Sequence, residues 1–430
     1  MAARSTGFLT AAVVTTLGAF AMTLGAQGGT PQTPAGQTPA AAAGQGRGRG
    51  GGPITIRAAR ILDGKGGSIA NGVITIQGTK ITSVTPAAAN QTAATYDLGD
   101  VTVLPGMIDV HVHLNWYFGP NGKYGERDLP ADYEGQAVQA NARATLLAGF
   151  TTVQSLGWAK DKPLREAIAA DLIAGPRLLS SLDQISPRQT DTPDQLRERV
   201  RRNKQNGADV VKLFASGSIR DGGKMSVTQE QIDAVCGEAK AQGLRSLVHA
   251  HDPQSIIASV KAGCSEIEHG LFADDAAIKA MKDANVFFDP NIGLVLQNYL
   301  WNKDHYMGSG NFNDEGFASM EKALPNLPIV FKKALDAGLR MPMGTDAVAG
   351  AHGENAREIV ARVKAGQTTT GALIGATSLA ALSLGLGDTI GTLAPGFEAD
   401  IVAAPGDAVA DITNVHHVKF VMKGGKIYKR

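Results

Sequence analysis

A glycine or asparagine recurs just before a short apolar run along most of the chain, and this repeat constrains the fold more than any other feature. These glycine and asparagine residues are Gly149, Gly175, Gly207, Gly243, Gly263, Asn285 and Gly338. Helices often end in a left-handed residue, which favours glycine or asparagine, and in βα units a strand soon follows. The runs that follow cover residues 150–153, 177–179, 210–214, 247–249, 266–269, 286–289 and 341–345. With residues 107–113 as the first strand, eight strands alternate with helical stretches, which predicts an α/β fold of the TIM-type (β/α)8 barrel class.

Short β-like segments lie on both sides of this repeat. They cover residues 54–62, 72–84, 399–403 and 418–428. Turn-forming Gly and Pro residues separate them, as between the strands of a small sheet. We expect the two ends of the chain to form one small composite β-sandwich domain from residues 53–104 and 395–430, with the barrel at 105–394.

The start of the chain is typical of a secretory signal peptide. Arg4 precedes an apolar run over residues 8–24, and the small residues Ala19, Ala21 and Ala26 offer cleavage positions. The run is diluted by Thr and Gly and lacks a basic stop-transfer flank, so we expect residues 1–26 to be removed and no stable membrane insertion to remain. A merely disordered or helical start is the alternative. The Gly-, Pro- and Ala-rich residues 27–52 predict a disordered linker, and the protein is expected to be exported, either periplasmic or secreted.

The charge balance and the cysteines limit the partners and the kind of site. The chain has 41 basic and 40 acidic residues, a net charge of +1, so no global field draws it to nucleic acid or to an anionic membrane. A small-molecule substrate is expected, and a homo-oligomer is compatible with the sequence. Cys236 and Cys264 allow at most one disulfide and exclude a four-cysteine zinc site. We expect both to be buried thiols.

His111 and His113 are one residue apart at the end of the first predicted strand. Because a strand has a period of two, both imidazoles face the same side, as in a metal chelate. Paired histidines also occur by chance on surfaces, but the C-terminal end of a barrel strand is where active sites lie in this fold. The position therefore favours a metal site.

Lys212 lies inside the apolar run over residues 210–214. Burial disfavours the ammonium, so a buried lysine becomes a nucleophilic amine that can add carbon dioxide and form a carbamate able to bridge two cations. The alternative is snorkelling, in which the ammonium reaches the rim of the barrel. The neighbouring strand ends favour the first interpretation: His249, His269 and Asp346 end the fifth, sixth and eighth strands. Structural histidines are the alternative for these positions.

At these residues the sequence resembles the amidohydrolase superfamily, in particular its imidazolonepropionase-like and Xaa-Pro dipeptidase-like (prolidase-like) branch. The resemblance covers about residues 54–430. One departure is Gln154-Ser155, where relatives often have an arginine-aspartate pair. The motifs that carry the resemblance are Pro105-Gly106-Met107-Ile108-Asp109-Val110-His111-Val112-His113, Val211-Lys212-Leu213, His249-Ala250-His251, Glu268-His269-Gly270, Gly344-Thr345-Asp346, Gly391-Thr392-Leu393-Ala394-Pro395-Gly396 and Ala399-Asp400-Ile401-Val402.

The resemblance implies a binuclear centre with two divalent metal ions, for which zinc suits the ligands. It implies that His111, His113 and Asp346 hold one ion and that His249 and His269 hold the other. N6-carboxylated Lys212 bridges the two. A water activated by the metals attacks the substrate carbonyl, Asp346 transfers the proton, and His251 stabilises the oxyanion or supports the ligands.

Substrate contacts are expected in the loops after the strands, above all in residues 291–313. The planar guanidinium of Arg220, in the loop after Lys212, suits a substrate carboxylate. Ordinary loop packing is the alternative for each candidate. The candidates are Arg220, Tyr299, His305, Tyr306 and His352.

Together these features predict a metal-dependent hydrolase of a carbon-nitrogen bond, acting on a small amide such as a dipeptide or an N-acyl amino acid. The enzymatic alternative is a cyclic amide or lactone hydrolase. A catalytically inactive barrel retained for binding is the alternative from another class, because a fold alone does not establish activity.

Overall fold

The computed structural model describes residues 52–88 and 93–430. The predicted signal peptide at 1–26 and all of the predicted linker except Gly52 lie outside the described residues.

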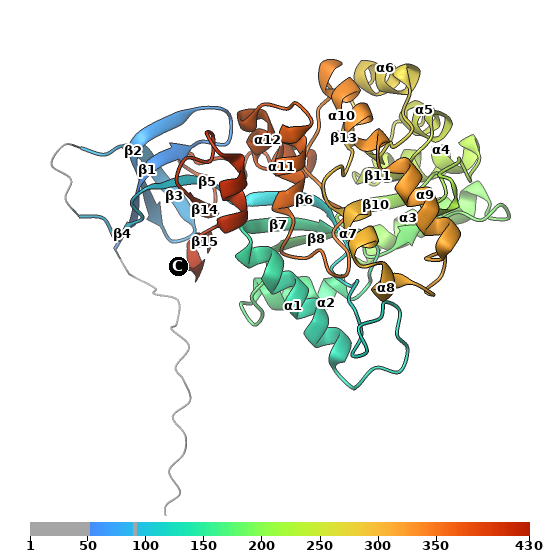
Figure 1. The fold of residues 1–430 in the computed structure, drawn as a ribbon, viewed down its shortest axis with the longest axis horizontal. Coiled ribbons are helices and arrows are strands. Elements are labelled where there is room, and N and C mark those ends of the chain that lie inside the picture. The colour runs from blue at the N-terminus through green and yellow to red at the C-terminus, as the bar shows by residue number, and fades with distance from the viewer. Residues whose placement is uncertain (1–51, 89–92) are drawn as a thin grey trace, which may run out of the picture. The chain divides into compact units, whose positions relative to one another are not determined.

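Strands from both ends of the chain form one eight-stranded sheet, at the end of the molecule drawn in blue and red in Figure 1. Its order is β16-β15-β14-β5-β1-β2-β3, with β4 beside β1. The two ends meet where β14 pairs antiparallel with β5, as in Val402 opposite Leu104. The strands are β1 (Ile54–Leu62), β2 (Ser68–Gln77), β3 (Lys80–Pro86), β4 (Tyr96–Asp97), β5 (Val101–Pro105), β14 (Ile401–Pro405), β15 (Phe420–Lys423) and β16 (Lys426–Lys429). This arrangement confirms the predicted composite β domain.

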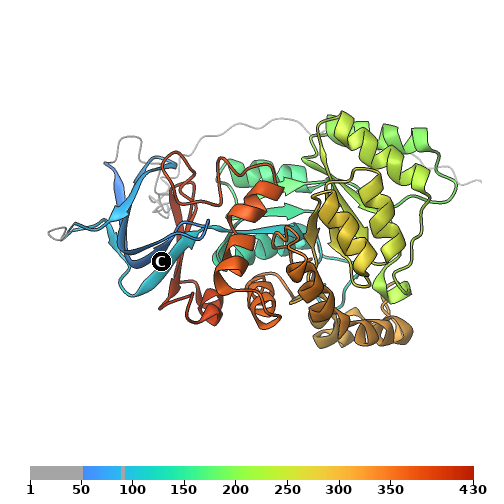
Figure 2. The same cartoon turned by 90° about the horizontal axis from the view of Figure 1, so that it is seen from above.

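The barrel strands form two parallel sheets, ordered β6-β7-β8 and β13-β12-β11-β10-β9. Most of their side chains are buried, because helices cover the outside of the strands (Figure 2) and side chains fill the interior of such a barrel. The strands are β6 (Met107–Val112), β7 (Phe150–Ser155), β8 (Arg177–Ser180), β9 (Gln184–Ile185), β10 (Val210–Phe214), β11 (Arg245–Ala250), β12 (Glu266–His269) and β13 (Phe287–Asp289). The fold class is the predicted TIM-type barrel.

The predicted eighth strand at 341–345 is wrong as a regular strand. The segment still lies between β13 and β6, because Phe288 N–H donates to Arg340 O (3.0 Å) and Val110 N–H donates to Met343 O (3.0 Å). Past that point Asp346 N–H donates to His111 O (2.7 Å). Gly344 and the turn at Asp346, whose φ is 52°, break the ladder here. The irregularity places Asp346 beside the first barrel strand.

Helices follow the barrel strands and cover them from outside. Their starts are fixed by local signals: Thr192 and Thr228 each form a capping box, with Gln195 and Gln231 respectively. Within the described residues, no helix is long and apolar enough to cross a membrane. The helices are α1 (Tyr133–Leu147), α2 (Asp161–Ala169), α3 (Pro193–Gln205), η1 (Ile219–Asp221), α4 (Gln229–Ala241), α5 (Pro253–Lys261), α6 (Asp275–Asp283), α7 (Val295–Trp301), α8 (Lys303–Tyr306), α9 (Asp314–Ala323), α10 (Asn326–Asp336), α11 (Ala356–Lys364), α12 (Thr369–Gly375), α13 (Ser378–Ser383) and η2 (Ile412–His417).

The expectation of two free thiols is wrong. Cys236 in α4 and Cys264, just before β12, form a disulfide with a Cα–Cα distance of 5.1 Å. Both residues are buried, as expected. The sequence spacing alone gave no reason to pair them, because the proximity comes from the packing of neighbouring βα units.

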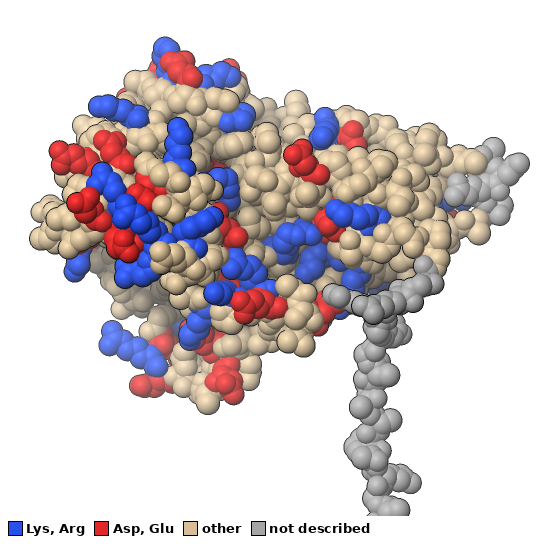
Figure 3. Space-filling model, turned by 180° about the vertical axis from the view of Figure 1, so that it is seen from behind, with Lys and Arg blue, Asp and Glu red and all other residues tan. Residues whose placement is uncertain are grey.

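Charged side chains of both signs are intermixed on the face shown in Figure 3. Several charged side chains of the protein form ion pairs, such as Arg201 with Glu238 (2.9 Å) and Arg199 with Asp183 (2.7 Å). Among the residues drawn there, neither sign dominates a broad area, in keeping with the net charge of +1.

Candidate metal centre and its cavity

A cavity of about 170 Å³ lies at the C-terminal ends of the barrel strands and brings together every residue predicted for the metal centre and the catalytic step. It is lined by His111, His113, Trp116, Gln184, Lys212, Phe214, Ser218, Ile219, Arg220, His249, His251, His269, Leu271, Pro290, Asn291, Val295, Leu296, Tyr299, Leu327 and Asp346. The residues predicted for the metal centre and the catalytic step thus converge on one space from five separate stretches of the chain.

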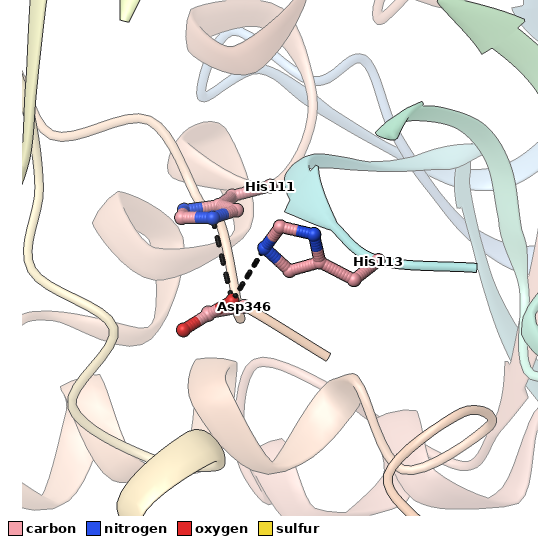
Figure 4. A group of neighbouring side chains, drawn as sticks. All are labelled: His111, His113 and Asp346. Atoms are coloured by element: carbon pink, nitrogen blue, oxygen red, sulfur yellow. Dashed lines mark ion pairs between the residues drawn. The ribbon is translucent and has the colours of Figure 1, made fainter. Parts of the chain in front are cut away.

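His111, His113 and Asp346 form the first group of potential metal ligands. Figure 4 shows both imidazoles pointing toward the Asp346 carboxylate. Asp346 Oδ1 lies 3.4 Å from His111 Nε2 and 3.1 Å from His113 Nε2. The strand period brings the two histidines to one side, and the left-handed turn at Asp346 brings the carboxylate to meet them.

His111, Glu268 and His269 form the second group. Within each group the donor atoms lie within 4.8 Å of one another. The His249 ring packs near that of His269, with 4.6 Å between ring centroids, and His251 stacks on His269 at 5.0 Å. Glu268 lies in the motif Glu268-His269-Gly270, but the sequence alone predicted no role for it. A signal was present, because Glu266 and Glu268 are two carboxylates at period two in a strand whose residues are all buried.

Lys212 is 1% exposed, and its Nζ donates to Glu268 Oε2. The ammonium therefore does not reach the barrel rim, so the snorkelling alternative is wrong. Burial raises the pKa of Glu268, and the nearby Lys212 charge opposes that rise. The two strands that carry this pair are separated by β11, so sequence spacing could not reveal the contact.

A layer of buried polar contacts below the cavity fixes the orientation of His111 and Asp346. Asp109 accepts hydrogen bonds from His111 N–H (3.1 Å), Thr345 Oγ1 (2.6 Å) and Asn355 Nδ2 (2.7 Å). Burial nevertheless raises the pKa of Asp109 to about 7. At Gly344 a Cβ would lie 2.0 Å from Asp289 Oδ2, so only glycine allows this close approach.

Burial keeps four imidazoles of the cavity neutral. It lowers the pKa of His111, His249 and His269 well below the usual value, and that of His251 to about 3. A neutral imidazole has a free lone pair, which is the form that binds metal. Within the described residues, neither ring nitrogen of His111 has a hydrogen-bond partner. The donor set thus fits a divalent cation such as zinc.

Arg220 and Tyr299 form part of the cavity wall, as predicted for residues that contact substrate. The guanidinium of Arg220 lies over the Phe312 ring at 4.0 Å and near the Tyr299 ring at 5.4 Å. Its Nε donates to Asn311 Oδ1 (2.7 Å). Phe312 and Asn311 were not predicted, because nothing in the sequence of this loop indicates its contact with Arg220.

The other three predicted substrate residues do not line the cavity. His305 is exposed and its Nδ1 lies 2.5 Å from Gly122 O. Tyr306 is buried and donates to Ala349 O (2.7 Å), and His352 Nε2 lies 3.2 Å from His113 O. These residues hold the surrounding loops in place.

Trp116 lines the cavity, although the sequence analysis missed it. Its ring stacks on Tyr124 with 4.6 Å between centroids, and it lies 5.7 Å from the His113 ring. Its position three residues after His113, in the first loop beyond a barrel strand, was a usable signal.

At the departure from the resembling family, Gln154 lies in the barrel interior. Its Nε2 donates to Val110 O (2.9 Å), and its Oε1 accepts from Arg245 Nη2 (2.5 Å). An arginine thus contacts this position, but it comes from β11.

Residues 102–428 match the Amidohydrolase family, and the chain belongs to this family. The family is metal-dependent, and the protein is a hydrolase that acts on carbon-nitrogen bonds of small molecules.

Individual relatives support the branch. Ochratoxinase from Aspergillus niger is 28% identical over 333 residues, covering 73% of this chain and 67% of the relative. Imidazolonepropionase from Geobacillus kaustophilus is 24% identical over 420 residues, covering 84% and 91%. A solved Xaa-Pro dipeptidase with bound methionine in the active site has a TM-score of 0.78 and 28% identity, covering 88% of this chain and 100% of its own.

Proposed function

We propose that the protein hydrolyses the amide bond of a small substrate with a free carboxylate, such as a dipeptide or an N-acyl amino acid. The convergence of two groups of metal-binding side chains on one cavity, with Arg220 on its wall, carries the proposal. The likeness to an Xaa-Pro dipeptidase and to ochratoxinase supports it.

In this proposal His111, His113 and Asp346 would hold one divalent cation, and His249 and His269 would hold a second. The Lys212 amine would add carbon dioxide and release a proton to give a carbamate that would supply further oxygen ligands, which requires its ion pair with Glu268 to open. When bound, such cations lower the pKa of water and polarise a carbonyl oxygen.

The protein's own residues carry the proton and the developing charge. Asp346, with a side chain 14% exposed, accepts the proton of the attacking water and passes it to the leaving nitrogen. His251 lines the cavity and is neutral at pH 7, so it donates a hydrogen bond to the carbonyl oxygen as negative charge develops there.

Arg220 binds the substrate carboxylate in this scheme. Stacking on Phe312 and the bond from Nε to Asn311 leave the two Nη groups as donors for an incoming anion. A pair of parallel N–H···O bonds would fix the substrate relative to the metal centre.

We also propose that the enzyme works outside the cytoplasm. The disulfide between Cys236 and Cys264 supports this location, because disulfides persist in oxidising compartments. The signal-like start of the chain points the same way.

A substrate panel tests the proposal. Zinc-loaded and chelator-treated enzyme are assayed on dipeptides, N-acyl amino acids, cyclic amides and lactones. The amides with a free carboxylate are expected to be cleaved, and only by the metal-loaded form. Equal rates with and without metal, or cleavage of lactones and cyclic amides alone, would contradict the proposal.

The Arg220→Ala variant tests the carboxylate contact on the same substrates. Loss of a charge-assisted pair of hydrogen bonds is expected to raise KM about 10- to 100-fold, with a smaller change in kcat. Arg188→Ala serves as the control, because the Arg188 side chain is 83% exposed. An unchanged KM for Arg220→Ala would remove Arg220 from the substrate site.

A further inference from the structure

Arg220 is held on two sides by consecutive residues of the loop between α8 and α9, the region labelled at the lower right of Figure 1. Asn311 Oδ1 accepts from Arg220 Nε at 2.7 Å, and the Phe312 ring lies 4.0 Å from the centre of the guanidinium. One residue therefore holds an edge of the guanidinium and the next covers its face. We call this pair of residues the Asn311–Phe312 clasp.

The clasp is itself anchored. Asn311 Nδ2 donates to Asp221 Oδ2 at 2.7 Å, so the amide oxygen of Asn311 must be the atom that faces Arg220. Phe312 is 3% exposed and packs against Tyr299, with 5.0 Å between ring centroids. Asp221 ends η1, the short helix that also carries Arg220, so the contacts close a loop from Arg220 through Asn311 to Asp221.

A free arginine side chain loses much rotamer entropy when it binds an anion, which weakens binding. A guanidinium already fixed at one edge and one face loses less rotamer entropy on binding, so binding is stronger. The contacts also limit the binding geometry, because the Nε donor is occupied by Asn311 and one face of the guanidinium is covered by Phe312. The remaining Nη donors therefore favour an end-on approach of a planar carboxylate.

We propose that Asn311 is a positioning residue that sets substrate selectivity by fixing the Nη edge of Arg220 toward the cavity. This inference rests on the proposed carboxylate contact of Arg220. It adds that recognition of the carboxylate depends on the loop between α8 and α9, which contributes none of the residues lining the cavity.

The test compares two substrates that differ only in charge: the dipeptide cleaved fastest in the panel and its C-terminal carboxamide. Asn311→Ala is expected to raise KM for the free dipeptide about 3- to 10-fold, to leave kcat within about twofold, and to change KM for the carboxamide little. Asn313→Ala is the matched control. Asn313 caps α9 by accepting from Gly316 N–H (2.8 Å), so its loss disturbs the same loop without a bond to Arg220.

A double-mutant cycle shows whether Asn311 acts through Arg220. In an Arg220→Ala background, Asn311→Ala is expected to cause no further rise in KM. The inference is overturned if Asn311→Ala raises KM equally for both substrates, adds fully to Arg220→Ala, or leaves KM unchanged while Arg220→Ala raises it. If Arg220→Ala itself leaves KM unchanged, the proposed carboxylate contact fails first, and this inference fails with it.

Discussion

Three residues around the cavity have a left-handed backbone conformation that residues other than glycine rarely adopt. The φ angles are 69° at His269, 52° at Asn291 and 52° at Asp346. Such conformations cost about 1 kcal/mol or more each and persist only where the surrounding structure enforces them. Here the enforcing contacts are buried bonds such as that from Thr345 Oγ1 to Asp109 (2.6 Å). The protein thus gives up stability to aim potential ligands at one point.

Asp161 provides a pH-dependent test at a single residue. Its carboxylate is fully buried and accepts from Ser180 Oγ (2.7 Å), and burial raises its pKa from 3.8 to about 6. The native state therefore binds a proton more tightly than the unfolded state, so stability falls as the pH rises from about 4 to 6. Relative to Asp161→Asn, the wild type is expected to lose about 2 kcal/mol of unfolding free energy between pH 4.5 and 7.

Urea denaturation at the two pH values measures this difference. Asp194→Asn is the control for replacement of an exposed carboxylate, because the Asp194 side chain is 92% exposed. A difference between wild type and Asp161→Asn that grows at low pH would show that the sign is wrong.

Residues whose role follows from strand position were accessible to sequence reasoning. His111, His113, Lys212, His249, His269 and Asp346 sit in or at the end of buried runs, and the structure brings all six into one cavity. The loop residues that contact the site could not be predicted from the sequence. Asn311 contacts Arg220 across 91 positions, and no local periodicity encodes such a contact.

Among the elements, α4 is joined covalently to the segment just before β12 by the disulfide between Cys236 and Cys264, 28 residues apart. Closing a loop of this length restricts the unfolded chain. Replacing both cysteines by alanine is expected to lower the free energy of unfolding by about 3 kcal/mol. Neither cysteine lines the cavity, so the activity of the double variant at 25 °C should persist.

Urea unfolding with and without reductant tests this contribution. Reductant should destabilise the wild type and leave the double variant unaffected. Equal free energies of unfolding for the wild type and the double variant without reductant would show that the disulfide does not restrict the unfolded chain as expected.

Most strands were predictable because apolar runs and glycine punctuation are local signals, and β1 at Ile54–Leu62 matches the prediction at both ends. The failure at residues 341–345 has a local cause. Asp346 has a left-handed backbone conformation that places its side chain in the cavity and interrupts the regular strand hydrogen bonds. The apolar run that ends at Gly344 and Thr345 therefore does not form a regular strand.

At the scale of the whole molecule, bound metal should stabilise the fold, because its proposed ligands come from strands that are distant in sequence. Zinc at 100 times its Kd adds about 2.7 kcal/mol to the free energy of unfolding. Differential scanning calorimetry should therefore show a Tm at least about 3 °C higher for the zinc-loaded than for the chelated enzyme.

Lys212→Ala should bind less zinc and show a smaller shift, with metal content measured by mass spectrometry. His417→Ala, in η2 and away from the cavity, should behave as the wild type does. Identical Tm values for loaded and chelated wild type would contradict a metal centre made from these strands.

The pairing of β14 with β5 has a consequence for biosynthesis. β5 leads through Gly106 directly into the strand that bears His111, and Gly106 N–H donates to Asp400 O at 2.8 Å. β14 is synthesised long after β5, so the strand that bears His111 leaves the ribosome well before the segment that buttresses it. A nascent chain that has not yet exposed β14 cannot form this support, so assembly of the cavity that contains His111 must follow synthesis of β14.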